Sequence, residues 1–331
     1  MGVHNMFAHF IVPSLLGFAL LLSGMKVMEA SLERWAGHRL VSWVSKSTST
    51  PLRGFAVGTA ASALLQSSTA VTVLTIGFVN AGWLNLARSL GIILGTNVGT
   101  CFTTELMSLQ LHTYGVYFLA FGVVGWLVSF AFNEMRDAAS APRRINGLRY
   151  VSVATGGFGL LLVGFKLLQS IGPALRENGY FETLMRHTYD NLMWGVLGGA
   201  VITALVHSSS AVVAMCMGLA AAGAISPEAG IAIVLGANVG TCFTGLVASL
   251  GGGSGGRFVA LSQLALNVGG AALFFPLIGA LHDAAAWLAP GDPSAQIAHA
   301  QTIFNVLCSM IALPIAYLPV WRKGAPNPTS A

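Results

Sequence analysis

The strongest constraint on the fold is an internal duplication. Residues 54–109 align without gaps on residues 195–250, and 23 of these 56 positions are identical. Two blocks are nearly the same. ALLQSSTAV (63–71) matches ALVHSSSAV (204–212), and LGTNVGTCFT (94–103) matches LGANVGTCFT (235–244). A repeat of this length marks a structural unit that packs against its own copy. The sequence therefore predicts two related halves of one fold.

Composition places both halves in a membrane. Of the 331 residues, 55% are hydrophobic and only 8% are charged, whereas a soluble domain carries roughly 25% charged residues. The apolar stretches are long enough for membrane helices and lack the ten-residue alternation of a β-barrel. We therefore expect an all-α polytopic membrane protein in a lipid bilayer. The net charge of +5 indicates topology rather than nucleic-acid binding.

The apolar pattern predicts nine membrane segments. Those at 54–80 and 194–222 are expected to break at a Ser/Thr-rich cluster, and those at 88–108 and 230–250 to break near Gly95–Thr100 and its copy. We divide the chain into a first repeat (1–149), a second repeat (150–280), and an extra C-terminal helix with a short tail (281–331). The remaining predicted helices are residues 9–30, 114–133, 150–170, 257–280 and 298–320.

Loop charge distinguishes two topologies. If 54–80 and 194–222 are re-entrant hairpins and the N-terminus lies outside, twelve Lys and Arg residues fall in inner loops and only Arg176 and Arg186 in outer loops. This split fits the positive-inside rule. Each half then crosses three times, so the two repeats have inverted topology. Full spanning would instead make the halves parallel. We favour the hairpins, in a bacterial inner membrane with a cytoplasmic C-terminus.

Two polar clusters per half are the candidate binding residues. Consecutive hydroxyls at membrane depth are costly unless partnered. At a break in a helix they lie beside free backbone N–H groups, which bind anions, and freed carbonyl oxygens there suit Na+. The alternative is that these hydroxyls only bond their own helices. The candidate substrate ligands are Gln66, Ser67, Ser68, Thr69, His207, Ser208, Ser209 and Ser210, and the candidate cation or supporting residues are Asn97, Thr100, Asn238 and Thr241.

Two ionisable residues break the symmetry of the repeat. His207 stands where the first half has Gln66, and it either mimics the amide or responds to protons. Glu105 stands opposite Leu246, and it is either a cation ligand or a side chain that reaches toward the membrane surface. No cysteine or carboxylate lies at zinc-ligand spacing near His207. The serine clusters also lack the motifs of a hydrolase or a P-loop, so we expect no enzyme, no organic cofactor and no metal beyond Na+.

The paired QSST and Ser-rich clusters, together with GTNVGT and GANVGT, resemble the type II sodium–phosphate cotransporter family. The resemblance runs from about Gly17 to Pro314. RFVALSQLALNVGG (257–270) and AHAQTIFNV (298–306) resemble that family's His-x-x-Phe-Asn segments, with Gln263 and Gln301 in place of His. His299, two residues before Gln301, is not an equivalent of that His. The resemblance implies that inorganic phosphate binds between the two Ser-rich tips with Na+ nearby, and His207 in place of Gln leaves the coupling ion open.

Three functions are compatible with this pattern. The first, which we favour, is an alternating-access transporter of inorganic phosphate coupled to Na+. The second is a transporter of another oxyanion, with protons coupled through His207. The third is a non-transporting, phosphate-sensing membrane subunit. The resemblance also implies a separate PhoU-like regulator, because the sequence ends near Ala331 without the PhoU-like domain that many bacterial relatives carry, and a homodimer is a further expected partner state.

Overall fold

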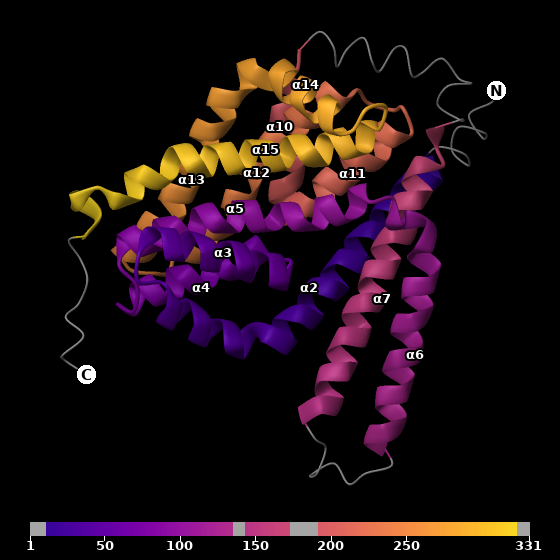
Figure 1. Cartoon of the computed structure of the whole chain (residues 1–331), viewed down its shortest axis with the longest axis horizontal. Helices are drawn as coiled ribbons and strands as arrows, with labels where there is room; N and C mark the ends of the chain where they lie inside the picture. The colour runs from indigo at the N-terminus through magenta and orange to yellow at the C-terminus, as the bar shows by residue number, and fades with distance from the viewer. Residues whose placement is uncertain (1–10, 135–142, 173–190, 323–331) are drawn as a thin grey trace.

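The computed structural model describes residues 11–134, 143–172 and 191–322, and every regular element in these ranges is helical (Figure 1). The α-helices are α2 (Val12–Ser47), α3 (Pro51–Leu65), α4 (Ser68–Asn80), α5 (Leu86–Ser108), α6 (Gly115–Glu134), α7 (Arg143–Gln169), α10 (Met193–Val206), α11 (Ser209–Ala221), α12 (Pro227–Ser249), α13 (Ser254–Phe274), α14 (Ile278–Leu288) and α15 (Pro293–Ala312). Short 3₁₀ turns cover Leu111–Tyr114, Phe275–Leu277, Leu313–Tyr317 and Pro319–Arg322.

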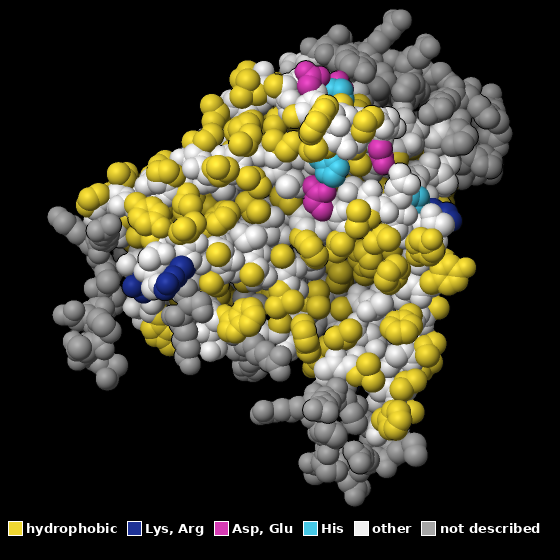
Figure 2. Space-filling model, in the orientation of Figure 1, with side chains coloured by type: hydrophobic (Ala, Val, Ile, Leu, Met, Phe, Trp, Pro, Cys, Tyr) yellow, Lys and Arg dark blue, Asp and Glu magenta, His cyan; other side chains and the backbone are white. Residues whose placement is uncertain are grey.

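The helices have the length and surface of a membrane protein. Six segments of the described chain are long and apolar enough to cross a bilayer. Side chains such as Phe121, Trp194 and Leu205 are more than two-thirds exposed, and Figure 2 shows hydrophobic side chains spread over the visible face with few charges between them. Such a surface is stable only against lipid. The prediction of an all-α polytopic membrane protein is confirmed.

Both Ser-rich segments break where the sequence predicts. Gln66 ends α3 in the left-handed conformation (φ 58°), and Ser67 is the N-cap of α4. His207 ends α10 in the same conformation (φ 56°), and Ser208 is the N-cap of α11. A left-handed residue followed by an extended one stops a helix and starts another in a new direction. Each segment is therefore two half-length arms joined at a polar tip.

The first broken segment turns back on itself. A Cβ placed on Gly54 would lie 2.8 Å from the carbonyl oxygen of Arg88, so α3 and α5 begin side by side. The other arm, α4, ends at Asn80, and only residues 81–85 separate it from the start of α5. Both ends of the segment consequently lie at the same end of the bundle. This geometry is that of the hairpin, whereas the inverted orientation in a bilayer stays a prediction.

The predicted breaks in 88–108 and 230–250 are wrong, because α5 and α12 are continuous helices. Their glycines serve close packing instead of unwinding. A Cβ on Gly99 would lie 2.5 Å from the carbonyl oxygen of Thr59 in α3, and one on Gly240 would lie 2.8 Å from Cβ of Thr203 in α10. Small residues let two helix backbones touch in this way. The GTNVGT and GANVGT blocks are thus helix-contact surfaces.

Several predicted boundaries move. The first helix was expected over 9–30, but α2 runs to Ser47 and packs against α7, which in turn packs against α6 (Figure 1). The segment predicted over 257–280 is divided between α13 and α14 by a 3₁₀ turn at Pro276, where the missing N–H of proline interrupts the helix. The last predicted helix, 298–320, begins earlier and ends earlier, as α15 over Pro293–Ala312.

The last helix, α15, is the structural counterpart of α13. Helix α13 packs against α4 and α12, whereas α15 packs against α11 and α5. Asn267 of α13 donates to Cys242 Sγ (3.2 Å), and Asn305 of α15 donates to Cys101 Sγ (3.4 Å). Cys101 and Cys242 are equivalent positions of the duplication. The pseudo-symmetric core therefore pairs α4 with α11, α5 with α12, and α13 with α15.

Candidate functional site

The first serine of each tip caps the helix that follows it. Ser67 Oγ accepts a hydrogen bond from the Ala70 amide (3.3 Å), and Ser208 Oγ accepts one from the Ala211 amide (3.4 Å). An N-cap satisfies one of the amides left open in the first turn of a helix. Both serines were predicted substrate ligands, but their hydroxyls have a structural partner already.

The hydroxyls that follow remain available. Ser68, Ser209 and Ser210 are at most 6% exposed, and within the described ranges their hydroxyls have no hydrogen-bond partner. Thr69 is half-buried beside Ser68. The other backbone N–H groups in the first turn of α4 and of α11 point out of the helix N-terminus, where the helix dipole is positive. Each tip thus offers hydroxyl and amide donors that fit an oxyanion.

Gln66 and His207 do the same local job. The Thr103 hydroxyl donates to Gln66 Oε1, and the equivalent Thr244 Oγ1 lies 2.9 Å from His207 Nδ1. Both bonds tie the end of the first arm to the neighbouring long helix. Gln66 is buried, whereas the His207 ring is exposed and stacks on Phe243 at 6.2 Å between centroids. The imidazole therefore reproduces the glutamine's bond while presenting a titratable group at the surface.

Both tips converge on one turn of α2. Ser208 Oγ donates to Met25 Sδ (3.1 Å), and the Glu29 side chain interacts with the Ser67 hydroxyl. Residues four apart share one face of a helix, about 6 Å apart along its axis. Glu29 is only 13% exposed and forms a 2.9 Å ion pair with Lys26. Sequence reasoning missed Glu29, although an acid inside a membrane helix is itself a functional signal.

The predicted supporting residues divide into two groups. Asn97 Nδ2 donates to Asn267 Oδ1 (2.7 Å), and Asn267 Nδ2 donates to the carbonyl oxygen of Asn238 (2.8 Å). These two hydrogen bonds connect α5, α13 and α12. Thr100 and Thr241 instead donate to carbonyl oxygens four residues earlier in their own helices. Asn97 therefore connects the two halves through Asn267, whereas the Asn238 side chain (Nδ2 to the Val234 carbonyl, 3.3 Å) and the threonine hydroxyls are bonded within their own helices.

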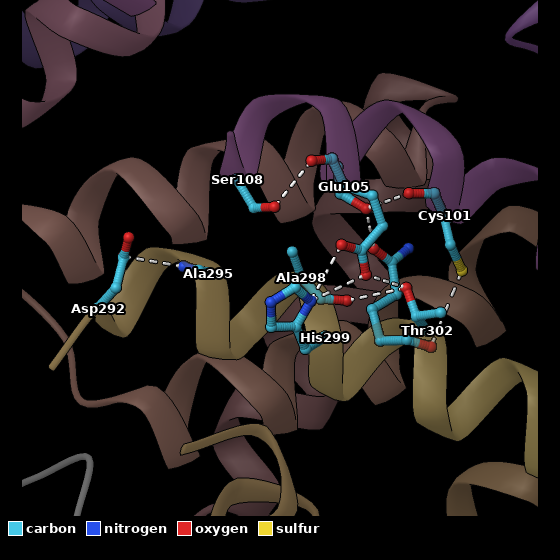
Figure 3. Close-up of polar contacts among 10 residues, drawn as sticks. Cys101, Glu105, Ser108, Asp292, Ala295, Ala298, His299 and Thr302 are labelled. Atoms are coloured by element: carbon cyan, nitrogen blue, oxygen red, sulfur yellow. Dashed lines mark hydrogen bonds and ion pairs between the residues drawn. The ribbon is translucent and has the colours of Figure 1, made fainter. Parts of the chain in front are cut away.

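Glu105 belongs to a separate polar contact between α5 and α15 (Figure 3). Its Oε2 lies 3.0 Å from His299 Nδ1, and Thr302 donates its hydroxyl to Oε1. His299 thus pairs with Glu105, a contact that its position outside the sequence motif did not predict. No hydrogen bond among the described residues joins Glu105 to either serine tip. The Glu105 carboxylate therefore connects α5 to α15, and it does not lie at the tips as a ligand.

Comparison with known proteins agrees with this architecture. A sequence model described as Na+/Pi-cotransporter matches twice, over residues 20–170 and 160–313. An uncharacterized protein of Bacillus subtilis, YqeW, is 30% identical over 90% of this chain and 92% of its own length. A "Putative inorganic phosphate export protein YjbB" of Escherichia coli K12 is 26% identical over 89% of this chain, which spans about half (52%) of that protein.

A further match is shorter. The sodium-dependent phosphate transport protein 2A of Rattus norvegicus is 30% identical over 30% of this chain and 16% of its own length. No solved structure matches the chain. The paired family matches cover both halves of the duplication, including both tips and both long helices. The chain therefore belongs to the Na+/Pi-cotransporter family and is a multi-pass membrane transporter of phosphate, not an enzyme.

Proposed function

We propose that inorganic phosphate binds between the tips of the α3–α4 and α10–α11 hairpins. The observation that carries this proposal is the convergence of two half-helix N-termini on one turn of α2, each with hydroxyls that lack a partner within the described chain. Ser68, Thr69, Ser209 and Ser210 supply the ligands. Ser67 and Ser208 hold the tips in shape, as do Gln66 and His207 through their threonine partners.

Coupling to Na+ and alternating access complete the proposal. A divalent oxyanion inside a membrane needs a compensating positive charge. Among the described residues, the basic side chain near the tips is Lys26, and its charge is balanced by its ion pair with Glu29. Bound Na+ would supply that charge. The duplicated hairpins resemble the paired, discontinuous helices that line midplane sites in transporters with inverted repeats. The separate PhoU-like regulator and the homodimer stay predictions.

The deciding experiment is phosphate flux in proteoliposomes containing the purified chain. Labelled phosphate is measured with an inward Na+ gradient, an outward Na+ gradient, and K+ in place of Na+. We expect flux to follow the direction of the Na+ gradient. Because one relative is named for export and another for sodium-dependent transport, both gradients are needed. Equal flux in Na+ and K+ would refute the coupling, and saturable phosphate binding without flux would favour a sensor.

A second candidate follows from the exposure of His207. A titratable ring at the tip suits a transporter of another oxyanion, such as sulfate, that couples to protons. Under the first proposal, the His207 ring only makes the bond that Gln66 makes in the other half. We therefore expect the His207→Gln variant to keep phosphate flux within about threefold of the wild type from pH 5.5 to 8. The matched control is His282→Gln, whose ring pairs with Glu228 away from the tips. Sulfate competition, together with loss of pH dependence only in His207→Gln, would support the second candidate.

A further inference from the structure

Two of the three buried oxygen atoms that lack a hydrogen-bond partner within the described ranges lie on neighbouring helices of the core. They are Thr72 Oγ1 in α4 and Gln263 Oε1 in α13, on side chains that are 2% and 1% exposed. Gln263 Oε1 and the methyl group of Thr72 (Cγ2) face Gly245 of α12. A Cβ on Gly245 would lie 3.2 Å from Gln263 Oε1 and 3.4 Å from Thr72 Cγ2. The side chains that carry the two oxygen atoms therefore meet at one junction of three helices.

The equivalent junction in the other half is closed by the protein itself. Thr104 occupies the position of Gly245 in the duplication, and its hydroxyl donates to Gln301 Oε1 (2.7 Å). Gln301 of α15 is the counterpart of Gln263, and Val213 of α11 is the counterpart of Thr72. One half thus satisfies its glutamine with a threonine. The other half replaces that threonine by glycine and adds a second oxygen instead.

Such an arrangement is suited to a bound water or cation that both oxygen atoms can contact. Buried polar atoms in native proteins are almost always satisfied, and each exception calls for a bound water or ion. Within a membrane bundle bulk water does not reach them. An amide oxygen and a hydroxyl oxygen are ligands that hard cations prefer. Because neither carries a charge, they suit a monovalent cation better than a divalent one.

The junction also lies close to the proposed phosphate. Thr72 follows Ser68 by four residues, so both side chains share one face of α4, about 6 Å apart along its axis. A cation at Thr72 would attract an anion held at the tip. Gln263 likewise lies one turn from Asn267, which connects α13 to Asn97 and Asn238. A cation bound at the junction would therefore affect both the hairpin tip and the hydrogen bonds of Asn267 to α5 and α12.

We infer that Na+ binds at the junction of α4, α12 and α13, with Gln263 Oε1 and Thr72 Oγ1 as ligands. The link to transport rests on the proposed function, but the binding itself does not. The site exists in one half only, because Thr104 and Val213 close the other. The protein consequently has two similar phosphate-binding tips but a single cation site of this kind.

The test measures binding of radioactive ²²Na+ to purified protein in detergent, with and without phosphate. Thr72→Val installs the residue of the other half, and Gly245→Ser supplies Gln263 with a hydroxyl in the manner of Thr104. We expect both variants to bind ²²Na+ about tenfold more weakly or worse. The matched control is Thr75→Val, one turn along α4, whose equally buried hydroxyl already donates to the Val71 carbonyl. It should bind as the wild type does.

The outcomes separate this inference from the proposed function. If Thr72→Val and Gly245→Ser bind ²²Na+ as Thr75→Val does, or if the wild type binds none, the inference is overturned and a buried water is the better occupant. If the wild type binds ²²Na+ at this junction but transports no phosphate, the site stands and the proposed function fails. Monodisperse elution of either variant establishes that its loss of binding is not loss of fold.

Discussion

Alanine at Ser68 or at Ser209 is expected to weaken phosphate binding about 10- to 100-fold, because a hydrogen bond to a charged group contributes about 1.5–3 kcal/mol and each 1.4 kcal/mol changes affinity tenfold. Both hydroxyls are buried at the start of a half-helix and lack a partner within the described residues. Their positions are equivalent in the duplication, so the two variants should lose similar affinity. The measurements are equilibrium binding of labelled phosphate in detergent and initial flux in proteoliposomes.

A matched control is available in the same protein. Ser249 is as buried as the tip serines, and its hydroxyl donates to the Leu246 carbonyl at the C-terminal end of α12. Ser249→Ala should bind phosphate as the wild type does. Ser67→Ala makes a different comparison, because it removes an N-cap and is expected to cost about 1 kcal/mol of stability. If Ser68→Ala and Ser209→Ala behaved like Ser249→Ala, phosphate would have to bind elsewhere.

The tips could be predicted from sequence because three signals coincide there. The duplication aligned QSST with HSSS, hydroxyl runs are costly at membrane depth, and loop charge favoured segments that turn back. The structure places the left-handed residue at Gln66 in one half and at His207 in the other. Which serine caps the following helix, and which keeps its hydroxyl available for a ligand, depends on the backbone geometry at the tip. The order of residues in the sequence does not determine that geometry.

The remaining errors have identifiable physical causes. Glycine permits both unwinding and close packing, and a single sequence does not say which, so α5 and α12 were expected to break. Glu105 and His299 are 194 residues apart, and their contact exists only because α15 packs on α5. Glu29 was overlooked because it lies beside Lys26 in a helix read as a simple membrane span. The first two features depend on tertiary packing that local patterns do not encode, whereas Glu29, an acid inside an apolar helix, was visible in the sequence.

The close contact between α10 and α12 leads to the second large prediction. A Cβ on Gly236 would overlap the carbonyl oxygen of Val196 and lie 2.9 Å from the Ala200 amide nitrogen. These are backbone atoms of a neighbouring helix, so no rotamer change relieves the overlap. Gly236→Ala must push α10 away from α12, and overpacking of this kind costs about 1–3 kcal/mol or more. We expect a clearly lower midpoint of thermal denaturation in detergent.

Gly198 provides the control, because it lies in the same helix as Val196 and Ala200 but a Cβ there meets nothing within 4 Å. Alanine is the better helix former by about 1 kcal/mol, so Gly198→Ala should be neutral or stabilising. Equal denaturation midpoints for Gly236→Ala and Gly198→Ala would contradict the packing described here. Since α10 ends at His207 and carries the second tip, a shift of this helix also displaces Ser209. Gly236→Ala should therefore lose phosphate binding along with stability, whereas Ser209→Ala should lose binding alone.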